Sequence, residues 1–273
     1  PTWPHPGPVD APGGPRRQTY PYYDAPTPGL DFEARFSSLA AGVEAGDFVL
    51  IHGCCHNPTG VDLSAEQWRQ LASLLSAKGA VPVVDFAYQG FVAGADEDAA
   101  PIRALASSVP EMVVCTSFSK NLGLYAERVG AITLMARDAD QASAVMSQLK
   151  RTIRSLYSNP PNHGASVVAL VLGDGELRGR WRRELAGMRE RIQAMRELFA
   201  GRLTDRGVSL SEGGNDFIKV QNGMFSFSGL SKAQVLRLRD DFGVYMVDSG
   251  RLNVAGITES NVDYLVEAIA AVA

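Results

Sequence analysis

Short apolar segments rich in β-branched residues alternate with segments of helical periodicity along the chain. Four of the apolar segments, at residues 48–52, 81–85, 112–117 and 129–135, contain few polar side chains. Strands with this composition are typically buried on both faces, as in a largely parallel sheet covered by helices. The pattern therefore predicts an α/β fold with a mostly parallel sheet.

Helical periodicity is clearest in two segments. The first begins at Ser64, where Ser-x-x-Gln is typical of a capping box, and ends before Gly79. The second, from about 174 to 206, predicts one long charged helix because its apolar residues recur every three or four positions. We expect this helix to join a large cofactor-binding domain, residues 1–186, to a smaller domain, residues 187–273.

The smaller domain combines short strands with helices. Apolar runs predict strands at 217–220 and 223–227, whereas helical periodicity predicts helices near 232–242 and 260–272. No internal repeat is visible in the sequence. This mixture predicts an α+β architecture for the C-terminal part of the chain.

Polar residues follow three of the predicted strands at the point where each strand ends. They lie at 52–57, 85–88 and 117–120. In open α/β sheets, ligands collect at the carboxyl ends of the strands. We therefore expect these three segments to form the rim of a binding or catalytic site.

Composition and charge exclude several classes of protein. A hydrophobic content of 45% in 273 residues can supply a substantial core, and the net charge of -4 comes without a basic run, so nucleic acid is not an expected partner. No apolar stretch reaches bilayer length, so no membrane partner is expected, and the Pro-rich N-terminus does not have the pattern of a signal peptide. Three cysteines, two of them adjacent, predict no disulfide framework and favour the reducing cytoplasm.

Lys120 is the strongest candidate for chemistry. It follows the apolar segment at 112–117, lies beside Ser117 and Ser119, and precedes Arg128 by eight residues. Burial and a neighbouring cation lower the pKa of an amine, so a lysine in this setting is nucleophilic near neutral pH. The hydroxyl groups and the guanidinium suit a phosphate. This combination is typical of a lysine that forms a Schiff base with an anionic cofactor, although a lone lysine after a strand is more often simply solvated.

Three other interpretations have weaker support. The Ser-x-x-Lys sequence at 117–120 also occurs in penicillin-interacting serine enzymes, but their Lys-Thr-Gly and Ser-Asp-Asn motifs are absent. The chain has neither a Walker phosphate loop nor a dinucleotide fingerprint. The two histidines and two cysteines at 52–56 could ligate zinc, but adjacent cysteines rarely face one ion and a turn follows at once, so we expect no metal site.

Five short motifs occur along the chain in a recognisable order. They are His-Asn-Pro-Thr-Gly at 56–60, Asp-Phe-Ala-Tyr-Gln-Gly at 85–90, Ser-Phe-Ser-Lys-Asn at 117–121, Glu-Arg-Val-Gly at 127–130 and Ser-Gly-Arg-Leu-Asn-Val-Ala-Gly at 249–256. From about Tyr20 to the C-terminus, the chain resembles the class I aspartate and aromatic-amino-acid aminotransferases, which use pyridoxal 5'-phosphate and have fold type I. The resemblance implies transfer of an amino group between an aromatic or acidic L-amino acid and a 2-oxo acid such as 2-oxoglutarate.

The resemblance assigns catalytic roles to three residues. Lys120 would hold the cofactor as a Schiff base and move a proton between the substrate α-carbon and the cofactor. Asp85 matches the carboxylate that keeps the pyridine nitrogen protonated, which makes the ring an electron sink. Tyr88 and Asn57 match the two groups that hydrogen-bond the phenolic oxygen of the cofactor. Tyr88 is the third residue to which the resemblance assigns a catalytic role.

Further residues match binding positions of the family. Ser117 and Arg128 match ligands of the cofactor phosphate, and Trp3 matches the aromatic residue that stacks on the cofactor ring. Arg251 matches the residue that grips the α-carboxylate of every substrate, a task that suits a planar two-point donor. The resemblance implies that Asn57 and Trp3 also contact the substrate.

Arg154 matches the arginine that reaches into the neighbouring subunit's site and pairs with the distal carboxylate of a substrate. Its presence implies that dicarboxylates such as aspartate, glutamate and 2-oxoglutarate are accepted. Aromatic substrates are not excluded, because some family members move this arginine aside. The resemblance also implies a homodimer with shared active sites, and closure of the smaller domain on the substrate.

Two departures from the family pattern concern the N-terminal region. The family's chain usually continues well upstream of the residue that Trp3 matches, with a glycine-rich turn for the cofactor phosphate, so we expect this chain, which begins at Pro1, to lack the N-terminal third. Residues 5–17 are rich in Pro and Gly and replace the Asn-His pair and apolar helix of the family, so we expect no regular helix there. A local reading-frame error is one hypothesis for this second departure.

Two alternatives to an aminotransferase stay open from the sequence. The same lysine and cofactor could support decarboxylation or β-elimination, as in a pyridoxal-phosphate lyase or decarboxylase. The chain could also be a catalytically inert fragment of an aminotransferase that serves as an interaction partner. Cofactor binding separates the second alternative from the others.

Overall fold

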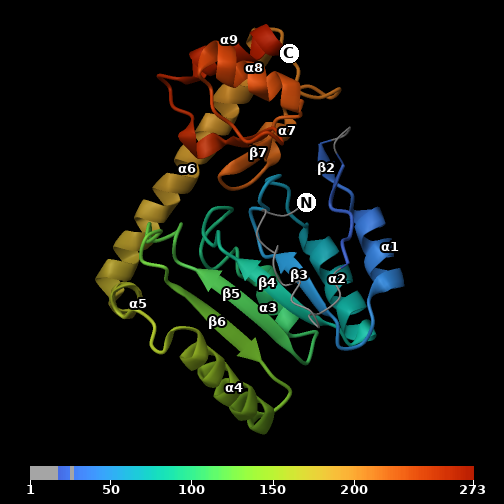
Figure 1. Ribbon diagram of the computed structural model, residues 1–273, viewed down its shortest axis with the longest axis vertical. Helices are drawn as coiled ribbons and strands as arrows, with labels where there is room; N and C mark the ends of the chain where they lie inside the picture. Colours follow the sequence, from blue (N-terminus) through green and yellow to red (C-terminus); the bar gives the residue numbers. More distant parts are fainter. Residues whose placement is uncertain (1–17, 25–27) are drawn as a thin grey trace. The chain divides into compact units, whose positions relative to one another are not determined.

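The computed structural model describes residues 18–24 and 28–273, which are drawn as ribbons in Figure 1. The chain forms two compact units. The sheet unit comprises residues 42–54 and 64–187, and the C-terminal unit comprises residues 55–63 and 188–273 together with residues 18–24 and 28–41. The domain boundaries predicted from the sequence stay predictions.

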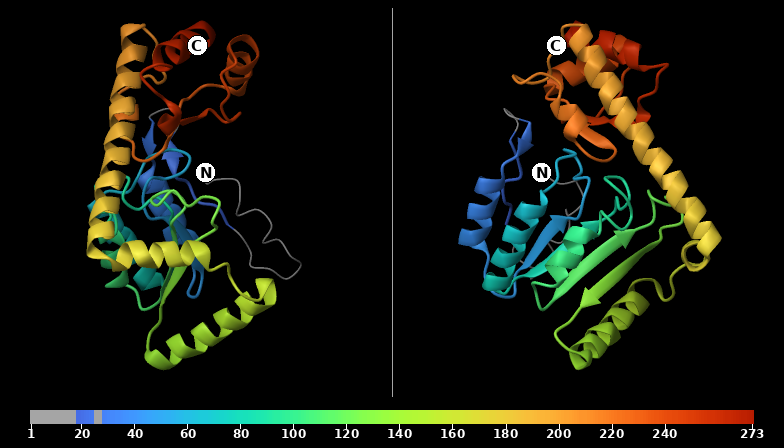
Figure 2. Two further views of the ribbon diagram at one scale, coloured as in Figure 1. Left: turned by 90° about the vertical axis from the view of Figure 1, so that its left-hand side faces the viewer. Right: turned by 180° about the vertical axis from the view of Figure 1, so that it is seen from behind.

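A four-stranded sheet lies at the centre of the sheet unit (Figures 1 and 2). Its strands follow the order β3 (Phe48–His52), β4 (Val81–Phe86), β5 (Met112–Ser117) and β6 (Gly130–Met135). The first three are parallel, and β6 runs antiparallel to β5. The mostly parallel sheet and the α/β class predicted from the apolar segments are confirmed.

Helices α2 (Ala65–Lys78) and α3 (Ala100–Ala106) pack together in the sheet unit. The predicted capping box at Ser64 is present, and α2 ends at Gly79, whose left-handed backbone (φ 65°) favours glycine. The buried face of α2 is formed by Trp68, Leu71, Ala72 and Leu75.

Three helices of the sheet unit, α3, α4 (Ala139–Tyr157) and α5 (His163–Gly173), were not predicted. Asp138 caps α4 by accepting a hydrogen bond from the Gln141 N–H at 2.7 Å. Helix α4 has no buried side chain, and both figures show it beyond the β6 edge of the sheet. Within this unit its apolar residues are therefore partly or largely exposed, and Met146, Leu156 and Tyr157 are the most exposed of them.

The long charged helix predicted for 174–206 is α6 (Gly175–Asp205), which begins in the sheet unit and ends in the C-terminal unit. No helix in the described part of the chain is long and apolar enough to cross a bilayer. The other elements of the C-terminal unit are short: β1 (Tyr23–Asp24), β2 (Gly29–Leu30), α1 (Phe32–Gly42), α7 (Phe217–Val220), β7 (Phe225–Phe227), α8 (Lys232–Phe242), β8 (Arg251–Asn253), η1 (Val254–Gly256) and α9 (Val262–Val272).

The core of the C-terminal unit is apolar, with two buried cations, Arg35 and Arg196. Fully buried side chains from α6, α7, α8 and α9 supply it: Phe199, Leu203, Ile218, Leu238 and Ile269. Arg196 of α6 is also fully buried, and it donates hydrogen bonds to the backbone carbonyls of Ile218, Gly223 and Phe225 at 3.0, 2.8 and 2.7 Å. The guanidinium thus fixes the chain that leads into β7.

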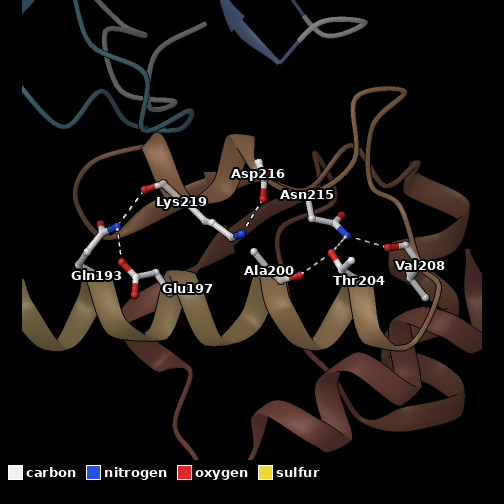
Figure 3. A network of polar contacts seen from close by, with 8 residues as sticks. All are labelled: Gln193, Glu197, Ala200, Thr204, Val208, Asn215, Asp216 and Lys219. Carbon is white, nitrogen blue, oxygen red and sulfur yellow. Dashed lines mark hydrogen bonds and ion pairs between the residues drawn. The ribbon is translucent and has the colours of Figure 1, made fainter.

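The strand predicted for 217–220 is wrong, because this segment is the single helical turn α7. Lys219 Nζ pairs with Asp216 Oδ1 at 2.6 Å across the turn. The Asn215 side chain, which precedes the turn, donates to the Val208 carbonyl at 2.7 Å (Figure 3). A run of four residues is too short for apolar character alone to distinguish a strand from a helical turn.

Candidate functional site

The predicted site residues of the sheet unit lie at the carboxyl ends of its parallel strands. Asp85 is the penultimate residue of β4 and is paired with His52 of β3 and Cys115 of β5. Ser117 is the last residue of β5, and Lys120 follows in the next turn. The sheet therefore brings the ends of three predicted strands to one edge, as the polar segments indicated.

Lys120 is half-buried and lies over an aromatic ring. Its Nζ is 4.7 Å from the centroid of the Tyr88 ring. Burial lowers the pKa of the Lys120 amine; Asp85 opposes this shift and the Arg128 guanidinium adds to it. Because the folded chain gives up this proton more readily than the unfolded chain, the free energy of unfolding rises with pH between the lowered pKa and that of an ordinary lysine. The neutral, nucleophilic form of the Lys120 amine therefore forms at a lower pH than that of an ordinary lysine.

The turn that carries Lys120 is fixed by its neighbours. The Ser119 N–H donates to Ser117 Oγ at 3.2 Å, and the Gly123 N–H donates to the Lys120 carbonyl at 3.2 Å. Buried Asn121 links this turn to two other segments. Its side-chain amide donates to the Gln89 backbone carbonyl at 3.3 Å, and its backbone carbonyl accepts from Trp181 Nε1 at 2.7 Å. The amine is thus held on a preorganised loop.

The loop after β4 is organised around the buried carboxylate of Asp98. Its two oxygens accept hydrogen bonds from four successive or nearly successive backbone N–H groups, at 2.7 to 3.2 Å: those of Gly90, Val92, Ala93 and Gly94. The same loop contains Tyr88, whose ring lies under the Lys120 amine. By holding the backbone of this loop, Asp98 therefore stabilises the surroundings of Lys120. Sequence reasoning missed Asp98, because an acid within an acidic, loop-like stretch carries no distinguishing pattern.

Replacing Asp98 with asparagine is expected to destabilise the protein by roughly 2 to 4 kcal/mol. The side-chain NH₂ group would face backbone N–H groups that now donate hydrogen bonds to a carboxylate oxygen, and those hydrogen bonds would be lost. Urea unfolding would measure the loss. The matched control is Asp96→Asn, since the Asp96 carboxylate is exposed and forms a surface ion pair with Arg182, which contributes little to stability. Equal stabilities of the two variants would contradict the supporting role of Asp98.

Arg128 lies between the Lys120 turn and β6. It has a left-handed backbone (φ 53°), and its Nη1 donates to the Tyr125 carbonyl at 2.7 Å. Two residues later Gly130 pairs with Ser117, and a Cβ at Gly130 would lie 2.6 Å from the Thr116 carbonyl oxygen. Glycine is therefore required for β6 to approach β5 where Ser117 and Arg128 occur.

A second group of predicted residues lies in the C-terminal unit. Arg251 Nη1 donates to Asn57 Oδ1 at 3.0 Å, and its guanidinium carbon is 4.6 Å from the centroid of the Phe225 ring. Asn57 is buried and precedes a cis peptide bond to Pro58. Phe225 was not predicted, because its contact with Arg251 depends on the pairing of β7 with β8 rather than on sequence spacing.

Arg154 and Trp3 are the two remaining predicted residues, and the structure describes only the first of them. Arg154 is exposed in the last turn of α4. Trp3 and the segment 5–17 lie outside the described residues. Within 18–24 and 28–273, no group of three or more His, Cys, Asp or Glu side chains is arranged to hold a metal ion. The roles assigned to individual residues stay predictions.

Known proteins were found to match the chain in sequence and in structure. The family described as "Aminotransferase class I and II" matches residues 1–269. Aspartate aminotransferase of Salmonella typhi is 54% identical over 272 residues, which cover 100% of this chain and 68% of the relative. Aromatic-amino-acid aminotransferase of Escherichia coli (strain K12) is 46% identical, with the same coverage.

A solved structure gives the same result. The aromatic-amino-acid aminotransferase of Burkholderia pseudomallei, covalently bound to pyridoxal phosphate, superposes with a TM-score of 0.91 at 48% identity. The match covers 95% of this chain and 64% of that one. The chain thus spans about two thirds of the length of the proteins it matches.

Proposed function

Because this chain belongs to the class I and II aminotransferase family, we propose that it transfers amino groups between an L-amino acid and a 2-oxo acid, using pyridoxal 5'-phosphate. The family and the fold predicted from the five motifs are confirmed. The observation that carries the proposal is Lys120, a half-buried amine of lowered pKa above the Tyr88 ring and close to Asp85. This is the setting that a nucleophilic lysine requires.

The residues of the sheet unit fit pyridoxal 5'-phosphate. Lys120 supplies the amine for covalent attachment, Asp85 a carboxylate for the pyridinium nitrogen, and Ser117 with Arg128 donors for the phosphate. When bound, the cofactor supplies an electron sink for the electron pair released at the substrate α-carbon. Arg128 would exchange its bond to the Tyr125 carbonyl for the stronger, charge-assisted bonds to a phosphate.

Each side chain then has a definable task. The free Lys120 amine would accept the proton from the substrate α-carbon and, once protonated, would donate that proton again to complete the amino transfer. Asp85 keeps the ring nitrogen protonated, and Tyr88 orients the ring through its hydroxyl group. Because burial favours the neutral amine, Lys120 is ready to accept a proton at a pH where a solvated lysine is still charged.

Substrate binding is proposed for Arg251, whose planar guanidinium can grip the α-carboxylate by two parallel hydrogen bonds. Asn57 Oδ1 and the Phe225 ring support the guanidinium and fix its plane. Arg154 would bind the distal carboxylate of aspartate, glutamate or 2-oxoglutarate. Relatives named for aspartate and for aromatic amino acids both match, so we propose acidic and aromatic substrates alike.

A homodimer in the cytoplasm is the proposed working form. In the sheet unit, large apolar side chains are exposed on β6, α4 and α5: Ile132, Met146, Leu156, Tyr157 and Leu170. Arg154 belongs to the same helix α4. An exposed apolar surface that also carries a substrate-binding arginine favours a subunit interface at which Arg154 serves the neighbouring site. The names of the relatives give no support to a lyase or decarboxylase.

The proposal is tested by adding pyridoxal 5'-phosphate to the purified chain and recording the absorption spectrum. We expect a visible band from the lysine-bound cofactor, and borohydride reduction followed by mass mapping should place the label on Lys120. Capture should reach its plateau at a lower pH than for ordinary lysines, because the pKa of Lys120 is lowered. Aspartate or phenylalanine with 2-oxoglutarate should then yield the corresponding 2-oxo acid and glutamate. Label spread over exposed lysines, without a band, would favour the inert alternative.

A further inference from the structure

Residues 55–62, which contain Asn57, form a closed loop in the C-terminal unit. The Asp62 carboxylate accepts hydrogen bonds from the backbone N–H groups of Cys55 and His56, both at 2.9 Å. The Gly60 N–H donates to the His56 carbonyl at 2.7 Å. Gly60 has φ 72°, and a Cβ there would lie 2.6 Å from the Phe225 carbonyl oxygen. The loop is therefore compact and closely packed on β7.

Tyr22 contacts both ends of this loop, although it lies more than thirty positions earlier in the chain. Its ring stacks on the His56 ring, with the centroids 3.7 Å apart and the planes 17° from parallel. Its hydroxyl donates to the Val61 carbonyl at 2.7 Å. His56 Nδ1 is in turn 2.8 Å from Thr59 Oγ1 inside the loop. One side chain thus bridges the residue before Asn57 and a residue four positions after it.

Tyr22 is itself firmly held. Its side chain is 6% exposed, and the buried guanidinium of Arg35 lies over its ring at 5.0 Å from the centroid. Its backbone carbonyl accepts from the Asp31 N–H at 3.0 Å. Burial raises the pKa of the Tyr22 phenol, so the hydroxyl remains a donor throughout the working pH range.

We propose that Tyr22 is a positioning residue: by clamping the 55–62 loop, it sets the direction of the Asn57 amide and, through it, of Arg251. The hydrogen bond from Arg251 to Asn57 Oδ1 makes the guanidinium plane depend on where the loop holds that oxygen. A carboxylate bound by two parallel hydrogen bonds is sensitive to that plane. The expected effect on substrate binding rests on the function proposed above, whereas the fixing of the 55–62 loop by Tyr22 does not.

The clamp is tested on the chain without cofactor, by amide hydrogen exchange with residue resolution. Four N–H groups report on the loop, those of Cys55, His56, Gly60 and Val61, since each is bonded within it. Tyr22→Leu removes both the stack on His56 and the hydrogen bond to Val61. We expect these four amides to exchange about tenfold faster in this variant, because the local stability of the loop falls by about as much as one or two hydrogen bonds contribute. Tyr22→Phe keeps the ring stack and should give a smaller acceleration.

Tyr264 provides the matched control in the same unit. Its hydroxyl also donates to a backbone carbonyl, that of Phe242, but its side chain is exposed and its hydrogen bond joins α9 to α8 rather than to the 55–62 loop. Tyr264→Leu should leave the four reporter amides unchanged. Unchanged reporters in Tyr22→Leu, or an equal acceleration of all amides of the unit, would overturn the proposal.

The effect on substrate is measured separately, with succinate as a dicarboxylate probe of the cofactor-loaded chain. We expect Tyr22→Leu to weaken succinate about three- to tenfold, and Tyr22→Phe to restore most of the affinity. An unaltered affinity in a variant whose loop exchanges faster would overturn the link from the loop to Arg251. Failure of the unaltered chain to capture the cofactor would count against the proposed function and leave the exchange result standing.

Discussion

Lys120→Ala is expected to abolish covalent capture of pyridoxal 5'-phosphate and to reduce the rate of amino transfer by about 10⁴-fold or more. The variant loses the nucleophile that binds the cofactor, and it also loses the base at the substrate α-carbon, a function that alone is worth about 10²- to 10⁴-fold. The visible absorption band and the rate of glutamate formation from aspartate and 2-oxoglutarate measure the two losses.

A matched control is available for this variant. Lys78 lies at the C-terminal end of α2, away from the carboxyl ends of the strands, and Lys78→Ala removes the same charge. We expect its spectrum and rate to stay within about twofold of the unaltered chain, as for most surface substitutions. If Lys120→Ala kept the absorption band and the borohydride label, another lysine would be the attachment site.

Asp85→Ala is expected to retain the cofactor but to slow amino transfer by roughly 10²- to 10³-fold, the usual cost of removing one preorganised charge from a site. Attachment depends on Lys120 and on the phosphate ligands, which this change leaves in place. Removing Asp85 also removes the charge that raises the pKa of Lys120, so that pKa should fall further. The pH at which cofactor capture reaches its plateau should accordingly move to a lower value.

The exposed carboxylate of Asp140, in the first turn of α4, serves as the comparison. Asp140→Ala should leave both the rate and the pH of the plateau unchanged. An Asp85→Ala chain with an unaltered rate would show that no carboxylate is needed beside the ring nitrogen. A chain that loses the cofactor altogether would instead assign Asp85 to binding.

The strands of the sheet were predictable because they are short, nearly continuous apolar runs, and α6 was predictable because its apolar residues recur at helical spacing. The apolar run at 112–117 became β5, and the spacing of apolar residues at 174–206 became α6. Helix α4 was missed although its apolar residues recur at helical spacing, at positions 145, 146, 149, 153 and 156. The run at 217–220 was misassigned because four residues are too few for apolar character to distinguish a strand from a helical turn.

The candidate site was predictable only where its residues belong to motifs. Lys120, Asp85 and Arg251 lie within short sequences that point to one chemistry. Tyr22 and Asp98 do not, because their effect comes from contacts that the fold creates: Tyr22 reaches Val61 across 39 positions, and Asp98 collects backbone N–H groups that any sequence offers. Supporting residues of this kind become visible only when the hydrogen bonds are known.

The lowering of the Lys120 pKa carries a risk as well as a benefit. An amine whose neutral form is favoured for reaction with one aldehyde is also more reactive toward others, including open-chain sugars and the products of lipid oxidation. A cofactor attached to that nitrogen acts as a protecting group. The chain without its cofactor is then the form most vulnerable to carbonyl damage, and a supply of pyridoxal 5'-phosphate would preserve the protein as well as activate it.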